Sequence, residues 1–464
     1  MLATSISGCS GSATLHEFAP KAIDRSPLTF AVISDTHFGN EVGEGPKVKV
    51  TRALQNITSH GRLDALVVVG DLTDHGERGE YAQLTEVFQN QSNYTYPVKQ
   101  LMFMMGNHDN KSNRAETIYG KALKSFNNGE SYPLHTYRVI KGCPFITLSM
   151  LSRDITDVTD ASKAMAAYPE SSLEWLARNM ARAQQECPGK PIFVFTHMPP
   201  RWTCYATWSE YENAKAWCMS ILNPILNDYP QAVVFSGHSH YPIGDPRSIH
   251  QGANPDSERM NYYTVINTAS TTYSELHEGA VDGGTTQPGY DSVTEGLIVT
   301  VLPNGDIEIR RFDTYRNEEI APDSRWILRA PFDGSQFTYA DVRDRDDNPL
   351  GKKLYSGGAE PYFADGAEVK LKVEGRAIRV VFPQAYDNDC VFRYSVDVIN
   401  PVNGSKVVSA SIFSQFYLNS HAPESLEYMI EGLMYGKEYI IEVRAYDSYD
   451  NESEPLVRST CEIS

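Results

Sequence analysis

The sequence predicts an α/β fold with buried parallel strands, followed by a small all-β sandwich of the immunoglobulin-like kind. Short apolar runs alternate with helical patterns over the first two thirds of the chain, as in strand-helix-strand proteins. Several of these runs end abruptly in aspartate and histidine. From about residue 360 the pattern changes to alternating strands separated by turn residues.

Length and charge limit the kinds of protein that this chain can be. At 464 residues it is too long for one ordinary core, so a large domain with a smaller appended one is expected. No run of about twenty apolar residues is present, so we expect no transmembrane segment. The formal charge of −18 argues against binding to a nucleic-acid duplex, which requires clustered lysine and arginine. An anionic substrate would have to be attracted by something else, such as bound metal ions.

Five short apolar runs end in polar side chains. They are LTFAVISDTH (28–37), DALVVVGDLTD (64–74), LMFMMGNHDN (101–110), PIFVFTH (191–197) and AVVFSGHSH (232–240). Helical spacing between them, as in residues 80–88, implies crossovers and therefore parallel strands. The clearest helix is 171–186, with Ser171 and Glu174 as its capping box. Since parallel strands place their carboxyl ends at one edge, the polar ends should converge.

The residues at these strand ends have the chemistry of metal ligands. They are Asp35, His37, Asp71, Asn107, His108, His197, His238 and His240. Carboxylates and imidazoles suit borderline metals, and the lack of cysteine disfavours a structural zinc site. One ion cannot use so many ligands, whereas two ions could clamp both the attacking and the leaving oxygen at phosphorus. We therefore expect two divalent or trivalent metal ions, with manganese, iron and zinc as the candidates.

Other titratable residues are expected to be structural, with one exception. Isolated histidines usually make hydrogen bonds, and this applies to His16, His60, His135, His250, His277 and His421. The seven cysteines form no CxxC pair, and pairing of Cys204 with Cys218, or Cys390 with Cys461, stays open. Several charged residues near the motifs could touch phosphate oxygens: Asp74, His75, Arg78, Arg153 and Arg247. We retain only Arg153 as a substrate-binding residue, because it follows another apolar strand, 143–150.

In this order, the motifs DTH, GDLTD, GNHD, TH and GHSH resemble the calcineurin-like metallophosphoesterase superfamily over roughly residues 27–315. The resemblance implies a layered β-sandwich core flanked by helices and a hydrolase acting on phosphoric esters. It also implies the ligand sets: Asp35, His37 and His240 for one metal ion, Asn107, His197 and His238 for the other, and Asp71 as the bridge. The expected partner is therefore a small phosphate ester.

The same resemblance implies how the reaction would run. A metal-bound hydroxide would attack phosphorus, and His108 would act as general acid or stabilise charge on the leaving oxygen, oriented by Asp109. Asp74 stands where purple acid phosphatases carry a tyrosine, so that subgroup is not expected. Phosphomonoesters and phosphodiesters both stay open as substrates. The alternatives are a cyclic-nucleotide or glycerophosphodiester phosphodiesterase and, from another class, a non-catalytic surface binding protein.

Aromatic side chains follow the His197 motif. Residues 198–217 contain Trp202, Tyr205, Trp208 and Tyr211. Such side chains could stack on a base or enclose a sugar or lipid head, so this loop is a candidate for selecting the leaving group. Inward packing of the same aromatics is the competing interpretation.

The first 26 residues indicate a tether or the remnant of an export signal. Residues 6–9 end in Cys9 and look like a bacterial lipoprotein cleavage box, although little apolar sequence precedes them. We expect export to the cell envelope or the extracellular space, with a lipid tether at Cys9. A cytoplasmic location is the alternative.

Two segments follow the motif region. Residues 316–359 are charged and interrupted by proline, yet contain aromatics, which favours an ordered connector. Residues 360–464 resemble a fibronectin type III module, with Leu433 and Tyr439 spaced as in its tyrosine corner and Phe382 in place of the usual tryptophan. Such a domain is expected to support or position the enzyme, and a glycan or protein is its candidate partner.

Overall fold

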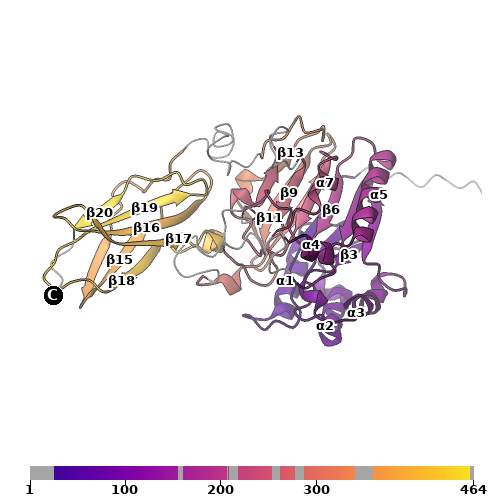
Figure 1. Cartoon of the computed structure of the whole chain (residues 1–464), viewed down its shortest axis with the longest axis horizontal. Coiled ribbons are helices and arrows are strands. Elements are labelled where there is room, and N and C mark those ends of the chain that lie inside the picture. Colours follow the sequence, from indigo (N-terminus) through magenta and orange to yellow (C-terminus); the bar gives the residue numbers. More distant parts are fainter. Residues whose placement is uncertain are drawn as a thin grey trace, which may run out of the picture.

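The computed structural model describes residues 26–154, 160–205, 207, 218–252, 262–276, 287–339 and 359–459. A large α/β part and a smaller all-β part lie side by side along the long axis of the molecule (Figure 1). The expected tether and Cys9 lie outside the described residues. Among the helices of the described ranges, none is long and apolar enough to cross a membrane.

The first sheet of the α/β part has seven strands. Their order is β12-β11-β10-β1-β2-β3, with β13 also paired to β11. The bounds are β1 (Leu28–Ile33), β2 (Ala65–Val69), β3 (Leu101–Met104), β10 (Glu295–Val301), β11 (Ile307–Asp313), β12 (Glu318–Ile320) and β13 (Trp326–Leu328). Strands β1, β2 and β3 are parallel, as predicted, while β10 to β13 add an antiparallel half.

The second sheet has six strands in the order β4-β5-β6-β7-β9-β8. The bounds are β4 (His135–Ile140), β5 (Cys143–Leu148), β6 (Ile192–Thr196), β7 (Ala232–Ser236), β8 (Ile249–Gln251) and β9 (Thr264–Asn267). Strands β5, β6, β7 and β9 are parallel. The five motif strands are therefore divided between two sheets, with three in the first and two in the second.

The two sheets pack face to face, with helices on their outer faces (Figure 1). Phe30 of β1 lies at the centre of the interface, 4.8 Å from the Phe193 ring and 4.9 Å from the Phe145 ring. Helices α1 (Pro46–Ser59), α2 (Arg78–Gln89) and α3 (Ala115–Ala122) share a core with the first sheet. Helices α4 (Ala161–Ala167), α5 (Glu170–Glu186) and α7 (Asn223–Leu226) share one with the second. The expected layered β-sandwich flanked by helices is confirmed.

One detail of the predicted helices is wrong. Helix α5 begins at Glu170 after Pro169, without a side-chain cap, so Ser171 lies inside the first turn and forms no capping box with Glu174. A capping box does occur at α2, where Glu77 and Glu80 bond each other's backbone N–H groups. Pro169 precedes the helix, and its carbonyl accepts the N–H groups of Ser172 at 2.8 Å and Leu173 at 3.0 Å, so the first turn forms without a side-chain cap.

The segment expected to be an ordered connector begins as part of the α/β part. Strands β12 and β13 pair with β11, and Trp326 is buried in the core between the sheets. Phe332 and Tyr339 pack against the same core. Residues 340–358 lie outside the described ranges.

The C-terminal part consists of two antiparallel sheets. One contains β14 (Lys370–Glu374), β15 (Ala377–Pro383) and β18 (Ser425–Ile430), and the other contains β16 (Val391–Ile399), β17 (Lys406–Phe413), β19 (Ile440–Asp447) and β20 (Leu456–Ser459). Phe382 is buried against Tyr394, with ring centroids 5.0 Å apart. The Met434 N–H donates to the Tyr439 hydroxyl at 3.3 Å, as in a tyrosine corner. This part therefore fits a fibronectin type III-like domain.

Candidate metal centre

The predicted ligands come together at the carboxyl ends of five strands. Asp35 and His37 follow β1, Asp71 follows β2, and Asn107 follows β3; His197 follows β6, and His238 and His240 follow β7. Their ligand atoms form a first group (Asp35, His37, His240) and a second group (Asp71, His197, His238, with Asn107 in contact). The face-to-face packing of the two sheets thus brings candidate ligands from both sheets into two neighbouring groups.

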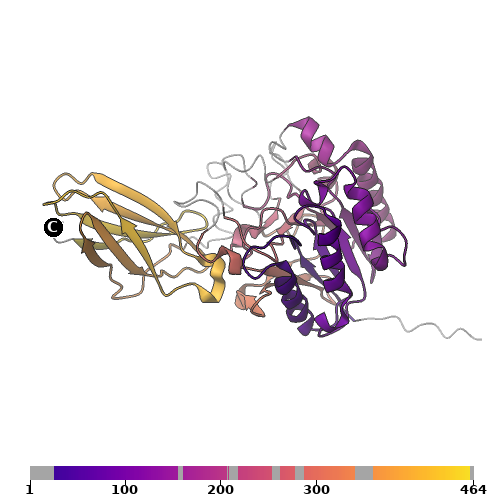
Figure 2. The same cartoon turned by 90° about the horizontal axis from the view of Figure 1, so that it is seen from below.

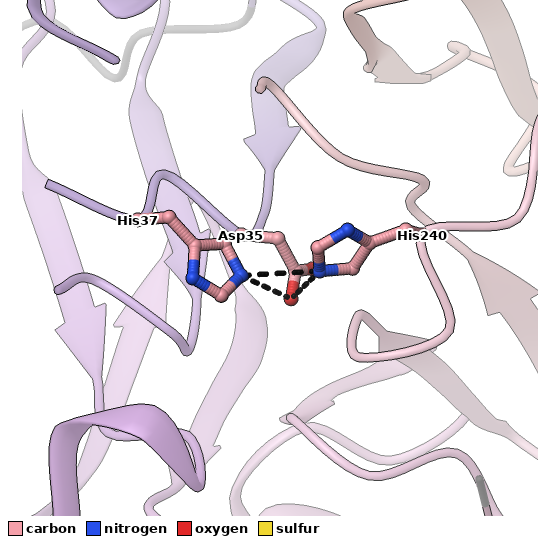
Figure 3. A group of neighbouring side chains, drawn as sticks. All are labelled: Asp35, His37 and His240. Atoms are coloured by element: carbon pink, nitrogen blue, oxygen red, sulfur yellow. Dashed lines mark hydrogen bonds and ion pairs between the residues drawn. The ribbon is translucent and has the colours of Figure 1, made fainter. Parts of the chain in front are cut away.

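The first group converges on one small volume (Figure 3). The Nε2 atoms of His37 and His240 lie 3.1 Å apart, and Asp35 Oδ1 lies 3.1 Å from His240 Nε2 and 3.8 Å from His37 Nε2. His37 Nδ1 lies 3.0 Å from the Asp74 carboxylate and donates to it. This contact leaves the lone pair of His37 Nε2 facing the group, which is the arrangement of a metal-binding imidazole.

In the second group, a backbone carbonyl fixes which ring nitrogen of His197 faces the other candidate ligands. The Val69 carbonyl can only accept, so His197 Nδ1, 2.9 Å away, carries the proton. His197 Nε2 then faces two acceptors, Asp71 Oδ2 at 3.2 Å and Asn107 Oδ1 at 3.1 Å. Burial lowers the pKa of His197, but Asp71 and Asp35 raise it overall to about 9. A proton on Nε2 satisfies these two acceptors when no metal is bound, and a metal ion in its place would have imidazole, carboxylate and amide ligands, a donor set that fits a divalent metal.

Asp71 lies between the two groups. Its Oδ2 atom is 3.2 Å from His197 Nε2 in the second group and 3.7 Å from His37 Nε2 in the first. Its other oxygen, Oδ1, accepts the backbone N–H of His108 at 2.8 Å. One carboxylate oxygen therefore faces both groups, as a bridging ligand requires.

The backbone at these residues is unusual. Non-glycine residues seldom adopt positive φ, yet the candidate ligands do so at Asp35 (53°), His37 (40°), Asp71 (43°), His238 (69°) and His240 (48°). Such strained residues cluster at functional sites and persist only where the surrounding structure holds them. Five of the seven candidate ligands therefore share this unusual conformation.

Two motif glycines are explained by close approach. A Cβ atom at Gly106 would collide with Asp71 Oδ1 and lie 2.7 Å from His197 Cδ2. A Cβ atom at Gly237 would collide with Ser34 Oγ and lie 2.5 Å from Asp35 Oδ2. The single glycine between the apolar run 101–105 and its polar end is therefore required by the packing of the ligands.

His108 lies beside the groups and is held by Asp74. Its Nδ1 donates to the Asp74 carbonyl oxygen at 3.0 Å and lies 3.2 Å from Asp74 Oδ1. The side chain is 32% exposed, and Nε2 makes no hydrogen bond within the described part of the chain. Burial lowers the pKa of His108, whereas Asp74 and Asp71 raise it overall to about 9. Nε2 is thus placed to carry a transferable proton.

The expectation that Asp109 orients His108 is wrong. The Asp109 carboxylate accepts backbone N–H groups of Leu72 at 3.1 Å, Thr73 at 3.0 Å and Gly106 at 2.9 Å, and the Tyr81 hydroxyl at 3.0 Å. Asp109 therefore joins the loops that carry Asp71 and Asn107 instead of contacting the neighbouring imidazole. Its carboxylate faces inward because the short helical turn His108–Asn110 places adjacent side chains on different sides.

Asp74 has a larger role in the structure than the sequence predicted, since it was considered only as a residue that could touch phosphate oxygens. It contacts His37 and His108 together, and although burial raises its pKa, the hydrogen bonds with both histidines hold that pKa well below its usual range. The spacing GDLTD contained the signal, because Asp74 closes the same strand-end motif as Asp71.

Tyr273 lies beside the first group, although the sequence analysis did not predict it as a site residue. Its half-buried ring lies 4.5 Å from the His240 ring and 5.7 Å from the His37 ring. Burial, with a smaller effect of nearby acids, raises the pKa of its hydroxyl above the usual range. Tyr273 lies in the polar segment that follows the apolar strand β9. Examining the residues after this strand, as was done for the five motif strands, could have found it.

The arginines near the motifs have different environments. Arg153 is exposed on the segment after β5, which borders the site because Asn110 Nδ2 donates to the Met150 carbonyl at 2.8 Å. No contact joins the Arg153 side chain to the two groups among the described residues. Arg247 is buried, pairs with Asp245 at 2.6 Å and cannot reach a substrate.

The aromatic loop after His197 is only partly described. Tyr205 is 3% exposed and packs against Tyr241, with ring centroids 4.7 Å apart, so it does not line a substrate site. Trp208 and Tyr211 lie outside the described residues. The thiols of Cys204 and Cys218 donate to the carbonyls of Ser248 and Thr207, each at 3.3 Å, and are not paired in a disulfide.

Comparison with known proteins agrees with this geometry. Residues 28–242 match the family model for calcineurin-like phosphoesterases, and the span contains every candidate ligand. The chain therefore carries a calcineurin-like phosphoesterase domain. It is a hydrolase acting on phosphoric ester bonds, and this family implies a dinuclear metal centre.

Related sequences are described in similar terms. A protein of Ruthia magnifica subsp. Calyptogena magnifica is 26% identical over 263 residues, covering 53% of this chain and 96% of that protein. One from Rhodococcus erythropolis is 27% identical over 233 residues, covering 46% and 66%. Both are described as a probable cyclic nucleotide phosphodiesterase. Among solved structures, purple acid phosphatase PPD1 from yellow lupin is 11% identical, with a TM-score of 0.44 over 69% of this chain and 55% of that chain.

Proposed function

We propose that the protein is a dinuclear metal-dependent phosphoesterase that hydrolyses phosphomonoesters or phosphodiesters. The observation that carries this proposal is the convergence of Asp71 and Asn107 oxygens on the Nε2 atom of His197. Its Nε2 faces Asp71 Oδ2 at 3.2 Å and Asn107 Oδ1 at 3.1 Å, while its proton is committed to Val69. A metal ion bound here would replace the Nε2 proton and contact all three ligand atoms, and a second group of the same chemistry lies beside it.

Each metal ion would have its own ligands. Asp35, His37 and His240 would hold one, and Asn107, His197 and His238 the other, with Asp71 shared between them. When bound, the pair of ions would lower the pKa of water and stabilise negative charge on phosphate oxygens. Manganese, iron and zinc are the candidates, because imidazole and carboxylate ligands suit all three.

His108 would supply the acid. Asp74 holds its Nδ1, so Nε2 faces away from that contact and can give a proton to the leaving oxygen or stabilise charge there. A phosphate ester with a poor leaving group depends most on this proton. Asp74 also holds His37, so one carboxylate would position both a ligand and the acid.

A cyclic-nucleotide phosphodiesterase is the second candidate function. The relatives from Ruthia magnifica and Rhodococcus erythropolis, each described as a probable enzyme of that kind, favour it. A non-catalytic binding protein is disfavoured, because relics lose ligands and here the full set converges.

The test is metal analysis of the purified protein followed by a substrate panel. We expect about two metal ions per chain. The panel is an aryl phosphate, a bis-aryl phosphodiester and a 3′,5′-cyclic nucleotide, each with Mn²⁺, Zn²⁺ or Fe²⁺ supplied. Preference for the cyclic nucleotide would select the second function. A protein that binds no metal and stays inactive on the whole panel would refute both.

A further inference from the structure

The C-terminal domain contacts the α/β part close to the candidate metal centre. A short helical turn, η7 (Phe416–His421), lies at the junction between the two parts (Figure 2). Buried side chains from both parts form one apolar cluster there, the junction cluster: Tyr205, Tyr241, Leu276, Val293, Phe392, Phe413 and Tyr417. Tyr241 directly follows the candidate ligand His240, so the cluster reaches the ligand loop.

Asn419 of η7 extends beyond this cluster into the α/β part. Its Nδ2 donates to Glu295 Oε1 at 3.0 Å. A Cβ atom at position 244 would lie only 3.0 Å from Asn419 Oδ1, so any residue larger than glycine would crowd this oxygen. The backbone of Asn419 has φ 52° and ψ −126°, which a non-glycine residue seldom adopts. A strained residue that is fitted against a glycine indicates a specific docking contact.

Glu295 connects Asn419 to the loop that follows His240, because its two carboxylate oxygens accept hydrogen bonds from both. Its carboxylate is fully buried, and Oε2 accepts the backbone N–H of Ile243 at 2.7 Å. The carbonyl of Ile243 accepts from Arg311 at 3.1 Å. Both polar groups of the Ile243 backbone are therefore held by the buried side chains of Glu295 and Arg311, three residues beyond His240.

The loop from His240 to Asp245 depends on such contacts. The His240 carbonyl accepts the Glu275 N–H at 3.1 Å, and the Tyr241 carbonyl accepts from Asn267 at 2.6 Å. His240 itself has a positive φ of 48°, a conformation that is maintained only when its surroundings impose it. Loosening the Ile243 end should therefore let the His240 ring leave its place.

We propose that Asn419 is a positioning residue: through Glu295 and Ile243 it keeps His240 directed at the first ligand group. The C-terminal domain is then part of the metal centre and not only an appended module. The inference rests on the proposed function for the role of His240 as a ligand. It adds that metal affinity in the α/β part depends on a side chain of the other domain.

The test compares Asn419→Ala with Val402→Ala, a control in the same domain whose side chain is 91% exposed. In the metal-free protein, hydrogen exchange in a peptide spanning 240–245 should become about tenfold faster in Asn419→Ala. In Zn²⁺ titrations, the binding step that His240→Ala abolishes should weaken about tenfold, and the other step should change less than about twofold. Val402→Ala should match the wild type in both measurements.

Gly244→Ala provides a second, independent variant in case Asn419→Ala does not fold. Its added methyl group would push on Asn419 Oδ1 from the opposite side, so the same binding step should weaken. Unchanged exchange and unchanged Zn²⁺ affinity in the folded variants would overturn the proposal. If the wild type bound no Zn²⁺ at all, the proposed function would fail, while faster exchange at 240–245 in Asn419→Ala would still support the positioning contact.

Discussion

Asp74 Oδ1 lies 3.0 Å from His37 Nδ1, and this contact decides which ring nitrogen faces the first ligand group. The same carboxylate lies 3.2 Å from His108 Nδ1. One side chain therefore sets the tautomer of a candidate ligand and the orientation of the candidate acid.

Asp74→Ala should weaken metal binding about 10-fold to 100-fold, the range for loss of a residue that orients a metal ligand. The reason is that His37 loses the acceptor that fixes its tautomer and ring plane. Metal content after dialysis at graded chelator concentrations measures the effect. Asp323→Ala, at an exposed position, is the control; equal metal retention in both variants would contradict the assignment.

Asp71→Asn should lose metal and activity together, with metal affinity falling by more than about 100-fold, beyond the loss for an outer residue. Oδ2 of Asp71 faces His37 and His197, so an amide there removes charge from both groups. Metal analysis and turnover on the preferred ester should be compared on the same preparation. A variant that kept two metal ions would show that Asp71 is not the bridge.

His108→Ala should keep both metal ions and lose about 10²-fold to 10⁴-fold in kcat, most for esters with poor leaving groups. In the proposed function His108 is not a metal ligand. Asp74 positions the His108 ring beside the two ligand groups. A series of aryl phosphates with leaving groups of rising pKa measures the effect. Loss of metal in this variant would mean that His108 is a ligand.

Stability should fall in acid because of His135. Its Nδ1 accepts the Ser149 N–H at 3.2 Å, its Nε2 lies 3.0 Å from Ser172 Oγ, and burial lowers its pKa to about 4 from the ordinary 6.5. Between these values the unfolded chain binds the extra proton, so stability present above pH 6.5 is lost as pH falls toward 4. The free energy of unfolding falls by about 3 kcal/mol at most through this group.

The measurement for His135 is the difference in Tm between wild type and His135→Gln at several pH values. The amide of glutamine can replace both hydrogen bonds without titrating. The advantage of the wild type should therefore shrink steadily below pH 6.5. A difference that stayed constant with pH would show that His135 does not titrate as described.

Much of the metal centre was predictable from the sequence because its signal is local. Each candidate ligand follows an apolar run, as in LMFMM before Gly106 and Asn107, and parallel strands of one sheet bring such ends to one edge. That the ends of β6 and β7 meet those of β1, β2 and β3 depends on the packing of the two sheets. The order of the motifs added the assignment to ligand sets. The alternating pattern after residue 360 likewise predicted the C-terminal sheets.

The types of the candidate ligands, their places at strand ends and the class of each domain were predictable from the sequence, since these depend on periodicity and on neighbouring residues. Two contacts became visible only in the folded chain: Asp74, not Asp109, holds His108, and Asn419 contacts Glu295 across the junction. Those hydrogen bonds join segments far apart in the chain. Their partners are selected by the packing of two sheets and two domains, which no local pattern specifies.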